Sequence, residues 1–288
     1  YSPNFGARVM AARRTNTIGA IIPTMENAIF ARGLEALQDE LRNHGYTMLV
    51  ASTAYQPQIE EELIRSLVAR GADALLLIGY HRDPGIYRFL EAQGVPVLLT
   101  WAFDPSSVHP AVGFDNQAAM QEMAAKVIAM GHRKLALISA DTSLNDRAAA
   151  RRDGILKEMI AAGLAPASLA FEETTYGIEE GAVAFERVMA LRDRPTAVFC
   201  GNDVLAVGAL RSARKLGLSV PQDVSVVGFD DIELAQVAFP ALTTVHVPHH
   251  QMGRHAGQAL VRHLRDGEPM TSTALPTRIV LRDTLGAA

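Results

Sequence analysis

Residues 224–245 read VSVVGFDDIELAQVAFPALTTV and hold two strand-like segments around an acidic loop. The first segment, residues 224–227, is a short apolar run with the β-branched content typical of a buried strand. Asp230 and Asp231 follow in the predicted loop, and a second β-rich segment covers residues 242–247. Ligands of open α/β sheets bind outside the carboxyl ends of the strands, because the loops leaving those ends line a crevice. This stretch therefore predicts a ligand site next to a hinge.

The rest of the chain repeats the alternation of strand and helix in two series. Apolar runs of strand length alternate with segments that carry apolar residues at helical spacing. The first series predicts strands at residues 17–22, 46–52, 73–79 and 95–101, and helices at residues 28–43, 58–69 and 85–92. The second predicts helices at residues 116–129, 145–162, 179–191 and 204–216, strands at residues 135–139, 169–172, 196–201 and 224–227, a last helix at 252–264 and a last strand at 275–281. A parallel sheet with both faces covered requires this alternation.

Two series joined near residues 111–116 predict two similar α/β lobes, each built on a doubly wound parallel sheet. We expect the N-terminal lobe to comprise residues 16–114 and 249–276, and the C-terminal lobe to comprise residues 115–248 and 277–288. If the last helix joins the first lobe and the last strand joins the second, the chain crosses between lobes three times. Three close crossings make a hinge, and a cleft between hinged lobes is a natural ligand site.

The composition excludes several classes of protein. The chain has 288 residues, of which 49% are hydrophobic and 20% charged, as in ordinary globular proteins, and its net charge of −4 does not favour polyanion binding by the bulk of the chain. A single cysteine, Cys200, allows no internal disulfide, so we expect a reducing compartment, the cytoplasm, and a buried strand position for this thiol. No apolar run approaches the roughly 20 residues that a membrane-spanning helix needs.

The sequence also lacks the motifs of common catalytic and cofactor sites. It contains no GxSxG, GxxxxGK[ST], GxGxxG or HExxH motif, so we expect neither an enzyme nor a bound cofactor. Four histidines, His246, His249, His250 and His255, gather near the predicted lobe crossing. No nearby carboxylate or cysteine completes a metal site around them, so we predict none.

Several motifs occur in the order and spacing of one protein family. They are Tyr1–Asn4 with Ala7, Arg8 and Met10, Asn16–Gly19, Ile22–Pro23, Gly45–Tyr46, Val112–Asn116, Gly131–Arg133, Cys200–Asp203 with Ala206 and Gly208, Val226–Asp231, and Pro240–Val245. Together they resemble the LacI family of bacterial transcriptional regulators. The motif VGFDN (residues 112–116) and the sequence of residues 203–208 are most similar to those of the gluconate-repressor-like members.

This resemblance implies a type I periplasmic-binding-protein-like core that binds a small effector and forms a homodimer. It also implies a missing N-terminal helix-turn-helix headpiece that binds operator DNA, with residues 1–15 as the hinge segment that joins headpiece and core. Asn4, Arg8 and Met10 would lie at the DNA minor groove, where hinge helices wedge an apolar side chain between base steps. The family usually has Leu at the wedge position, where this chain has Met10.

By resemblance, Arg151 is the arginine that binds effector hydroxyls or carboxylates, because a guanidinium makes two parallel hydrogen bonds to such groups. Arg147 lies one helical turn earlier, and two interpretations remain open for it: a shared face with Arg151, or an exposed side chain. Two arginines in the cleft would favour an anionic effector such as a sugar acid. Asp230 resembles the acidic residue that accepts hydrogen bonds from effector hydroxyls, the alternative being a turn aspartate bonded to its own backbone.

The remaining candidates are residues at strand ends and two aromatic side chains, of which Phe30 lies in a predicted helix, where an aromatic at helical spacing can also be a core residue. Either Asn202 or Asp203 is expected to cap the following helix, and by resemblance Asn202 also faces the cleft, whereas Asp203 has a purely structural alternative. Trp101, the single tryptophan, either stacks on a sugar ring or packs in a core between the lobes. Phe30 and Tyr176 match family positions that wall the effector pocket, and Tyr80 occupies a comparable strand end.

Taken together, the sequence predicts the effector-binding and dimerisation core of a LacI-type regulator, most simply a repressor, that senses a small sugar or sugar-acid-like molecule between its lobes. Effector binding would shift the population of lobe arrangements and so change operator affinity through linkage. The alternative is a periplasmic solute-binding protein of a sugar transporter, which has the same architecture. The basic, helix-prone residues 1–14 argue against that alternative.

Overall fold

The computed structural model describes residues 15–26 and 28–288, so the predicted DNA contacts Asn4, Arg8 and Met10 lie outside the described residues. The chain divides into two compact units. The first unit runs up to Gly113 and resumes at Pro248–Leu275; the second comprises Phe114–Val247 and Pro276–Ala288. The chain therefore passes between the units after residues 113, 247 and 275.

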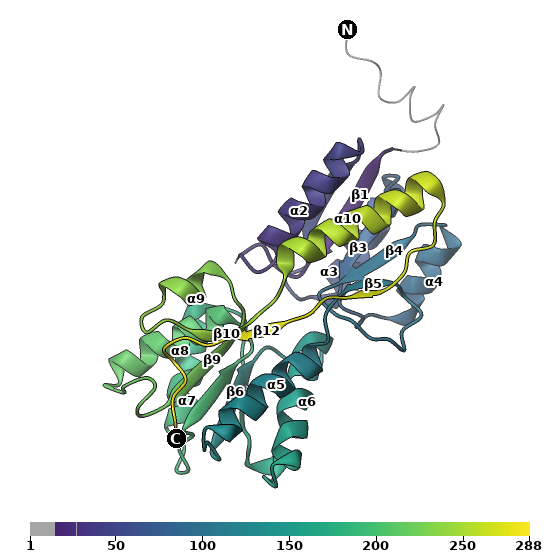
Figure 1. The fold of residues 1–288 in the computed structure, drawn as a ribbon. Coiled ribbons are helices and arrows are strands. Elements are labelled where there is room, and N and C mark those ends of the chain that lie inside the picture. Colours follow the sequence, from purple (N-terminus) through teal and green to yellow (C-terminus); the bar gives the residue numbers. More distant parts are fainter. Residues whose placement is uncertain (1–14, 27) are drawn as a thin grey trace. The chain divides into compact units, whose positions relative to one another are not determined.

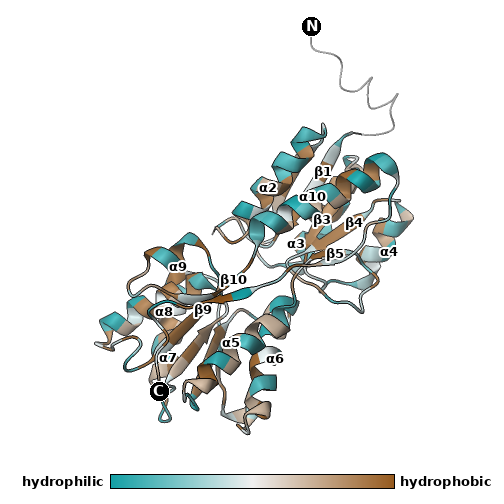
Figure 2. Ribbon diagram, in the orientation of Figure 1, coloured by the Kyte–Doolittle hydropathy of each residue, from teal (hydrophilic) through white to brown (hydrophobic). Residues whose placement is uncertain are grey.

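The first unit is built on a six-stranded sheet with the order β11-β5-β4-β3-β1-β2, in which each strand runs parallel to its neighbours (Figure 1). Its strands are β1 (Thr17–Ile22), β2 (Thr47–Ser52), β3 (Ala74–Ile78), β4 (Val97–Thr100), β5 (Ala111–Gly113) and β11 (Thr273–Ala274). The central strand β3 is buried along its whole length, and Figure 2 shows it as a continuous apolar segment. A strand covered on both faces needs this pattern.

The helices of the first unit are α2 (Ala31–Asn43), α3 (Pro57–Ala69), α4 (Pro84–Ala92) and α10 (His249–Asp266). Helix α10 comes from the far end of the sequence and packs directly on α2 (Figure 1). The contact depends on two glycines, because a Cβ atom at Gly253 would lie 1.9 Å from the carbonyl oxygen of Gly33. The backbones of the two helices thus touch where any larger side chain would force them apart.

The second unit repeats this plan with the strand order β12-β10-β9-β8-β6-β7, parallel except for the antiparallel pair β10–β12. Its strands are β6 (Leu135–Ser139), β7 (Ala170–Glu173), β8 (Ala197–Cys200), β9 (Ser225–Asp230), β10 (Thr243–His246) and β12 (Arg278–Val280). Its helices are α5 (Asn116–Ala129), α6 (Asp146–Ala161), the 3-10 helix η1 (Pro166–Ser168), α7 (Ile178–Met189), α8 (Asp203–Lys215) and α9 (Glu233–Val237). No helix among the described residues is long and apolar enough to span a bilayer.

Each sheet contains a point where the winding direction reverses. In the first sheet β1 lies between β2 and β3, and in the second sheet β6 lies between β7 and β8, so consecutive crossovers leave in opposite directions. The loops after β1 and β3, and those after β6 and β8, therefore diverge at the carboxyl edge of each sheet. Ligands of doubly wound folds bind at this position.

The predicted fold class, two doubly wound parallel α/β sheets, is confirmed, but several boundaries were wrong. The predicted last strand at 275–281 contains only the shorter β12, and β11 just before it was missed; the two strands belong to different units because the chain passes between the units after residue 275. Asp230, expected in a loop, is the last residue of β9. Helix α10 begins at His249, directly after Pro248, rather than at 252, and the short α9 was missed.

Candidate functional site

The carboxyl edge of the second sheet buries an arginine. Arg151, on α6, is 8% exposed; its Nη1 donates to Asn116 Oδ1 at 2.7 Å and its Nη2 to Tyr176 Oη at 2.9 Å. Its guanidinium carbon also lies 4.8 Å from the centre of the Phe229 ring, within cation–π range. Both acceptors are neutral oxygens, so these bonds orient the guanidinium without neutralising its charge.

The position of Arg151 follows from how α6 is built. Asn145 caps the helix by accepting a hydrogen bond from the Ala148 backbone amide at 3.2 Å. Gly154 lies three residues after Arg151 on the same face of the helix. A Cβ atom at Gly154 would lie 2.3 Å from the carbonyl oxygen of Gln117, so α6 approaches the first turn of α5 closely. This close approach brings Arg151 within reach of Asn116, the first residue of α5.

Asp230 ends β9 beside this arginine. Its side chain is buried, and its backbone has φ +104°, an unusual conformation for a residue other than glycine. Burial raises the pKa of Asp230 to about 7, against the opposing effect of the charges on Arg151 and Arg147. Asp230 is thus a buried carboxyl at a strand end, and its contact with effector stays a prediction.

Arg147 is largely buried rather than exposed. Its side chain is 10% exposed, and its Nη1 lies 2.9 Å from Asp146 Oδ1. It shares with Arg151 an electrostatic effect on Asp230. The interpretation of Arg147 as an exposed residue was wrong, whereas its contact with effector stays a prediction.

Asn202 and Asp203 follow β8 and have different roles. Asn202 caps α8 by accepting a hydrogen bond from the Leu205 amide at 2.9 Å, which confirms the predicted cap. Asp203 is fully buried and accepts hydrogen bonds from the Ile232 amide at 2.8 Å and the Thr244 hydroxyl at 2.5 Å. Burial, together with the charge on Asp230, raises the pKa of Asp203 well above its usual value. Asp203 thus holds the loop after β9 in place. This is the purely structural role that the sequence left open for it.

Three buried polar atoms near this edge have no hydrogen-bond partner within the described parts of the chain. They are Arg151 Nε, Asn202 Nδ2 and Ser139 Oγ. Ser139 is the last residue of β6, and its Oγ would lie 3.0 Å from a Cβ atom at Gly201, so the ends of β6 and β8 meet there. Buried polar groups are rarely left unsatisfied, and such a cluster at a switch point is typical of a ligand site. Sequence analysis missed Ser139, although its place at a strand end was a usable signal.

The histidines expected near the crossing separate into different environments. His246 Nδ1 lies 2.8 Å from Asp231 Oδ2, and Arg282 Nη2 donates to Asp231 Oδ1 at 2.6 Å. Burial raises the pKa of Asp231, but these two hydrogen bonds outweigh it and lower the pKa overall. His249 packs in the first unit, and within the described residues no group of three or more His, Cys, Asp or Glu side chains is placed to hold a metal. Cys200 lies fully buried in β8, as predicted, and burial raises the pKa of its thiol.

The carboxyl edge of the first sheet carries an aromatic cluster. Trp101 follows β4 with φ +59° and is 4% exposed. Its ring packs edge-to-face on Phe30 at 5.1 Å between centroids and lies 6.1 Å from the His249 ring. A Cβ atom at Gly33 would lie 2.6 Å from the indole, so the tryptophan rests on bare helix backbone. Trp101 and Phe30 are therefore core residues of the first unit, and their contact with effector stays a prediction.

Tyr80 sits at another strand end of the first sheet, in a loop held by a residue that the sequence analysis missed. Arg82, whose side chain is 1% exposed, donates to the carbonyl oxygens of Gly79 and Ile78 at 2.8 and 3.2 Å. It also donates to Tyr87 Oη at 2.5 Å and pairs with Glu60 at 3.1 Å. Tyr80 Oη accepts from the Asp104 amide at 3.0 Å. The loop after β3 is thus fixed by Arg82, which has a carboxylate partner of its own.

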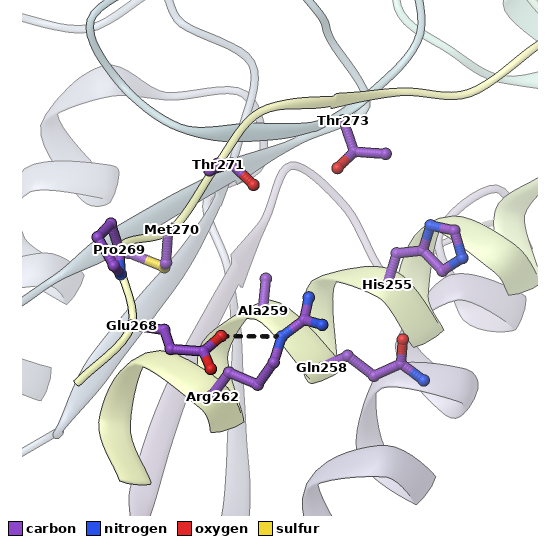
Figure 3. Close-up of a pocket in the computed structure, with 9 residues that line it drawn as sticks. All are labelled: His255, Gln258, Ala259, Arg262, Glu268, Pro269, Met270, Thr271 and Thr273. Carbon is purple, nitrogen blue, oxygen red and sulfur yellow. Dashed lines mark ion pairs between the residues drawn. The ribbon is translucent and has the colours of Figure 1, made fainter. Parts of the chain in front are cut away.

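A separate pocket of about 610 Å³ lies in the first unit (Figure 3). It is formed by one face of α10 and the segment that follows it, with Arg262 and Glu268 paired at 3.9 Å between the two. His255 and Thr273 line its other end. The residues predicted to bind effector contribute nothing to this pocket.

Comparison with known proteins decides the family. A profile of the periplasmic binding protein-like domain matches residues 124–285. The HTH-type transcriptional regulator GntR of Escherichia coli is 31% identical over 96% of this chain and 82% of its own length, and the HTH-type transcriptional repressor PurR of Erwinia tasmaniensis is 30% identical over 98% and 84%. A LacI family transcriptional regulator from Silicibacter pomeroyi superposes with a TM-score of 0.85 at 30% identity, covering 93% of this chain and 98% of that one. The chain belongs to the LacI family of transcriptional regulators.

LacI-family regulators bind small-molecule effectors and operator DNA and are typically dimers. The relatives favour a regulator over a transporter's solute-binding protein, and they are regulators rather than enzymes. Of the predicted effector residues, Arg151, Arg147, Asp230 and Tyr176 gather in the second unit, with Asn202 at the neighbouring strand end. Phe30 and Trp101 pack together in the first unit, and Tyr80 lies at another strand end of the same sheet.

Proposed function

We propose that this chain is the effector-sensing core of a LacI-type repressor whose second unit binds a small polyhydroxylated molecule that carries a carboxylate, such as a sugar acid. The observation that carries the proposal is the buried Arg151 guanidinium, which is hydrogen-bonded to neutral oxygens only and keeps Nε unbonded among the described residues. A guanidinium fork binds a carboxylate through two parallel hydrogen bonds.

The neighbours of Arg151 fit the rest of such a ligand. Asp230 offers acceptor oxygens to ligand hydroxyls, and Asn202 Nδ2 and Ser139 Oγ offer further hydrogen bonds at the adjacent strand ends. Arg147 adds positive charge on the same helix. A polyol bearing one carboxylate satisfies both the cationic groups and the neutral polar ones.

The response of the regulator is proposed to follow from effector contacts with both units. Trp101, Phe30 and Tyr80 are the first unit's candidates for these contacts: Trp101 directly follows β4 and packs on Phe30, and Tyr80 lies in the loop after β3. Effector binding then shifts the population of unit arrangements and changes how the hinge segment and headpiece engage operator DNA in the cytoplasm. The minor-groove residues in this proposal are Asn4, Arg8 and Met10.

Homodimerisation is proposed to use apolar side chains that each unit leaves uncovered. In the second unit Val237 and Phe239 are 76% and 91% exposed. In the first unit the edge strand β2 exposes Leu49 and Val50. Exposed apolar side chains of this size, adjacent in one segment, are typical of protein–protein interfaces.

Thermal-shift screening against sugars, sugar acids and nucleobases tests the effector proposal. The sugar acid that raises the melting temperature most is then titrated against Arg151→Ala and against the neighbouring Arg152→Ala, whose side chain pairs with Asp153 at 3.1 Å. We expect Arg151→Ala to weaken binding at least tenfold, because a hydrogen bond to a charged group contributes about 1.5–3 kcal/mol. We expect Arg152→Ala to bind normally. Unchanged affinity in Arg151→Ala would place the effector elsewhere.

A further inference from the structure

Three buried arginines of the described chain each pair with a carboxylate. They are Arg82 with Glu60 at 3.1 Å, Arg147 with Asp146 at 2.9 Å and Arg282 with Asp231 at 2.6 Å. Their side chains are 1%, 10% and 16% exposed, so each charge that is withdrawn from water meets an opposite charge. Arg151 is buried to a similar extent, at 8% exposed. Neither of its hydrogen bonds goes to a carboxylate, and no ion pair joins it to one among the described residues.

An amide holds Arg151 where the other buried arginines have a carboxylate. Asn116 is 4% exposed, and its Oδ1 accepts the hydrogen bond from Arg151 Nη1 at 2.7 Å. Asp115, the exposed residue before it, caps α5 by accepting a hydrogen bond from the Ala118 amide at 2.9 Å. Of these two adjacent residues, the one with a carboxylate therefore binds the helix backbone, and the one with a neutral oxygen holds the arginine.

The amide leaves the guanidinium charged and with unused donors. A guanidinium carries five N–H donors, and the bonds to Asn116 and Tyr176 use two of them. Its Nε has no hydrogen-bond partner within the described parts of the chain. A carboxylate in place of the Asn116 amide has almost the same shape and would accept the same hydrogen bond. It would also neutralise the guanidinium and repel a second carboxylate placed beside it.

We propose that Asn116 sets the charge class of the effector. Because Asn116 holds Arg151 through a neutral oxygen, the arginine takes its counter-charge from the ligand. The site therefore selects a polyol that carries a carboxylate over an uncharged polyol of the same shape. This inference rests on the proposed function, in which Arg151 binds the effector. Asn116 is a positioning residue in this role, because it acts through the arginine.

The test is isothermal titration of the full chain at pH 7 with gluconate and with glucitol, which has the same hydroxyl chain without the carboxylate. Asn116→Asp keeps the shape and the hydrogen bond but adds a charge, whereas Asn116→Ala removes the bond and adds no charge. We expect Asn116→Asp to weaken gluconate binding by about tenfold or more, because two carboxylates would then compete for one guanidinium. Asn116→Ala should weaken it by about two- to tenfold, the usual effect of one lost hydrogen bond. Glucitol affinity should not fall in Asn116→Asp.

An exchange of two neighbouring residues provides the matched variant. The double substitution Asp115→Asn/Asn116→Asp moves the carboxylate by one position at constant composition and net charge. Asn caps helices about as well as Asp, and a carboxylate in the first turn is favourable, so this variant should melt like the wild type and lose gluconate like Asn116→Asp. Asn43→Asp adds the same charge at the exposed end of α2. It should bind gluconate within about twofold of the wild type, because an exposed charge is screened.

The order of the variants separates charge selection from structural support. A purely structural role predicts that gluconate binding falls more in Asn116→Ala than in Asn116→Asp, and that order would overturn the inference. Thermal melts check the fold, and an Asn116→Asp variant that melts below Asn116→Ala would also overturn it, because the carboxylate would then not pair with Arg151. The proposed function survives either result if Arg151→Ala loses gluconate. A wild type that binds no gluconate, or an Arg151→Ala variant that binds it unchanged, would overturn both.

Discussion

Each unit buries an arginine near the carboxyl edge of its sheet, Arg82 in the first and Arg151 in the second, and these two arginines are held differently. Arg82 in the first unit has a carboxylate partner in Glu60 and bonds to two backbone carbonyls and a tyrosine hydroxyl. Arg151 in the second unit is held by an amide oxygen and a tyrosine hydroxyl and lies against an aromatic ring. A buried charge is stable only when paired and hydrogen-bonded. Arg82 meets that requirement within its unit, whereas Arg151 Nε has no hydrogen-bond partner among the described residues.

The same contrast extends to the whole of each edge. The first unit places Phe30, Trp101 and His249 in a tight aromatic cluster, while the second places titratable and amide groups at equivalent strand ends. The same doubly wound fold thus presents packed aromatic rings at the strand ends of one unit and hydrogen-bonding groups at those of the other. Effector specificity in this protein should therefore depend more strongly on the second unit.

The largest expected effect tests the structural role of Arg82. Arg82→Met should lower the free energy of unfolding by about 3–5 kcal/mol, because it leaves the mostly buried Glu60 carboxylate without its partner. The double variant Glu60→Gln/Arg82→Met should recover part of this loss. Arg151→Met should cost about 1 kcal/mol or less, since Asp230 can protonate when its cation is removed. Urea unfolding of the four proteins at pH 7 gives the comparison, and equal losses for the two arginines would remove the distinction drawn between them.

The next effect concerns the glycine that lets α6 approach α5. Gly154→Val should destabilise the protein by about 1–3 kcal/mol, because its Cβ would meet the Gln117 backbone and the helices must separate. The same separation moves Arg151 away from Asn116, so effector affinity should fall as well. Ala161→Val, at the exposed end of α6, is the control. Thermal melts measure the stability and calorimetric titration measures the effector affinity. A loss of stability with unchanged affinity would show that the approach of α6 to α5 does not position Arg151.

The smallest effect on folding should come from the uncovered apolar side chains, where the expected change is in assembly. Phe239→Asp and Leu49→Asp each place a charge on a surface proposed to face a second copy. Both substitutions should change the free energy of unfolding of the monomer by no more than about 0.5 kcal/mol, as surface substitutions usually do. Both should shift the sedimenting species from dimer toward monomer. Val108→Asp, at an exposed loop residue of the first unit, is the matched control. A variant that still sediments as a dimer would exclude its unit from the interface.

The sequence was sufficient to predict the fold class and most elements, because strand-length apolar runs and helical spacing are local signals. Arg151 and Asp230 were predicted as site residues by resemblance, and their proximity appeared only in three dimensions. Arg82 was missed because it carries no local pattern: what distinguishes it is burial and the partners that distant elements bring. Ser139 was missed although it ends a predicted strand, because its burial shows only in three dimensions. The chain's last passage between the units was predicted to within one residue, whereas the two-residue strand β11 before it was missed, because so short a segment carries no periodic pattern.

The close contact between α10 and α2 has a consequence for how the protein is made. Helix α2 leaves the ribosome early, but its glycine-lined partner surface is supplied by residues 249–266, after nearly the whole second unit has been translated. Until then the nascent first unit exposes Gly33, Leu37 and the indole of Trp101, all of which the finished molecule covers. We therefore expect newly synthesised chains to be most prone to aggregation in the interval before α10 covers this surface.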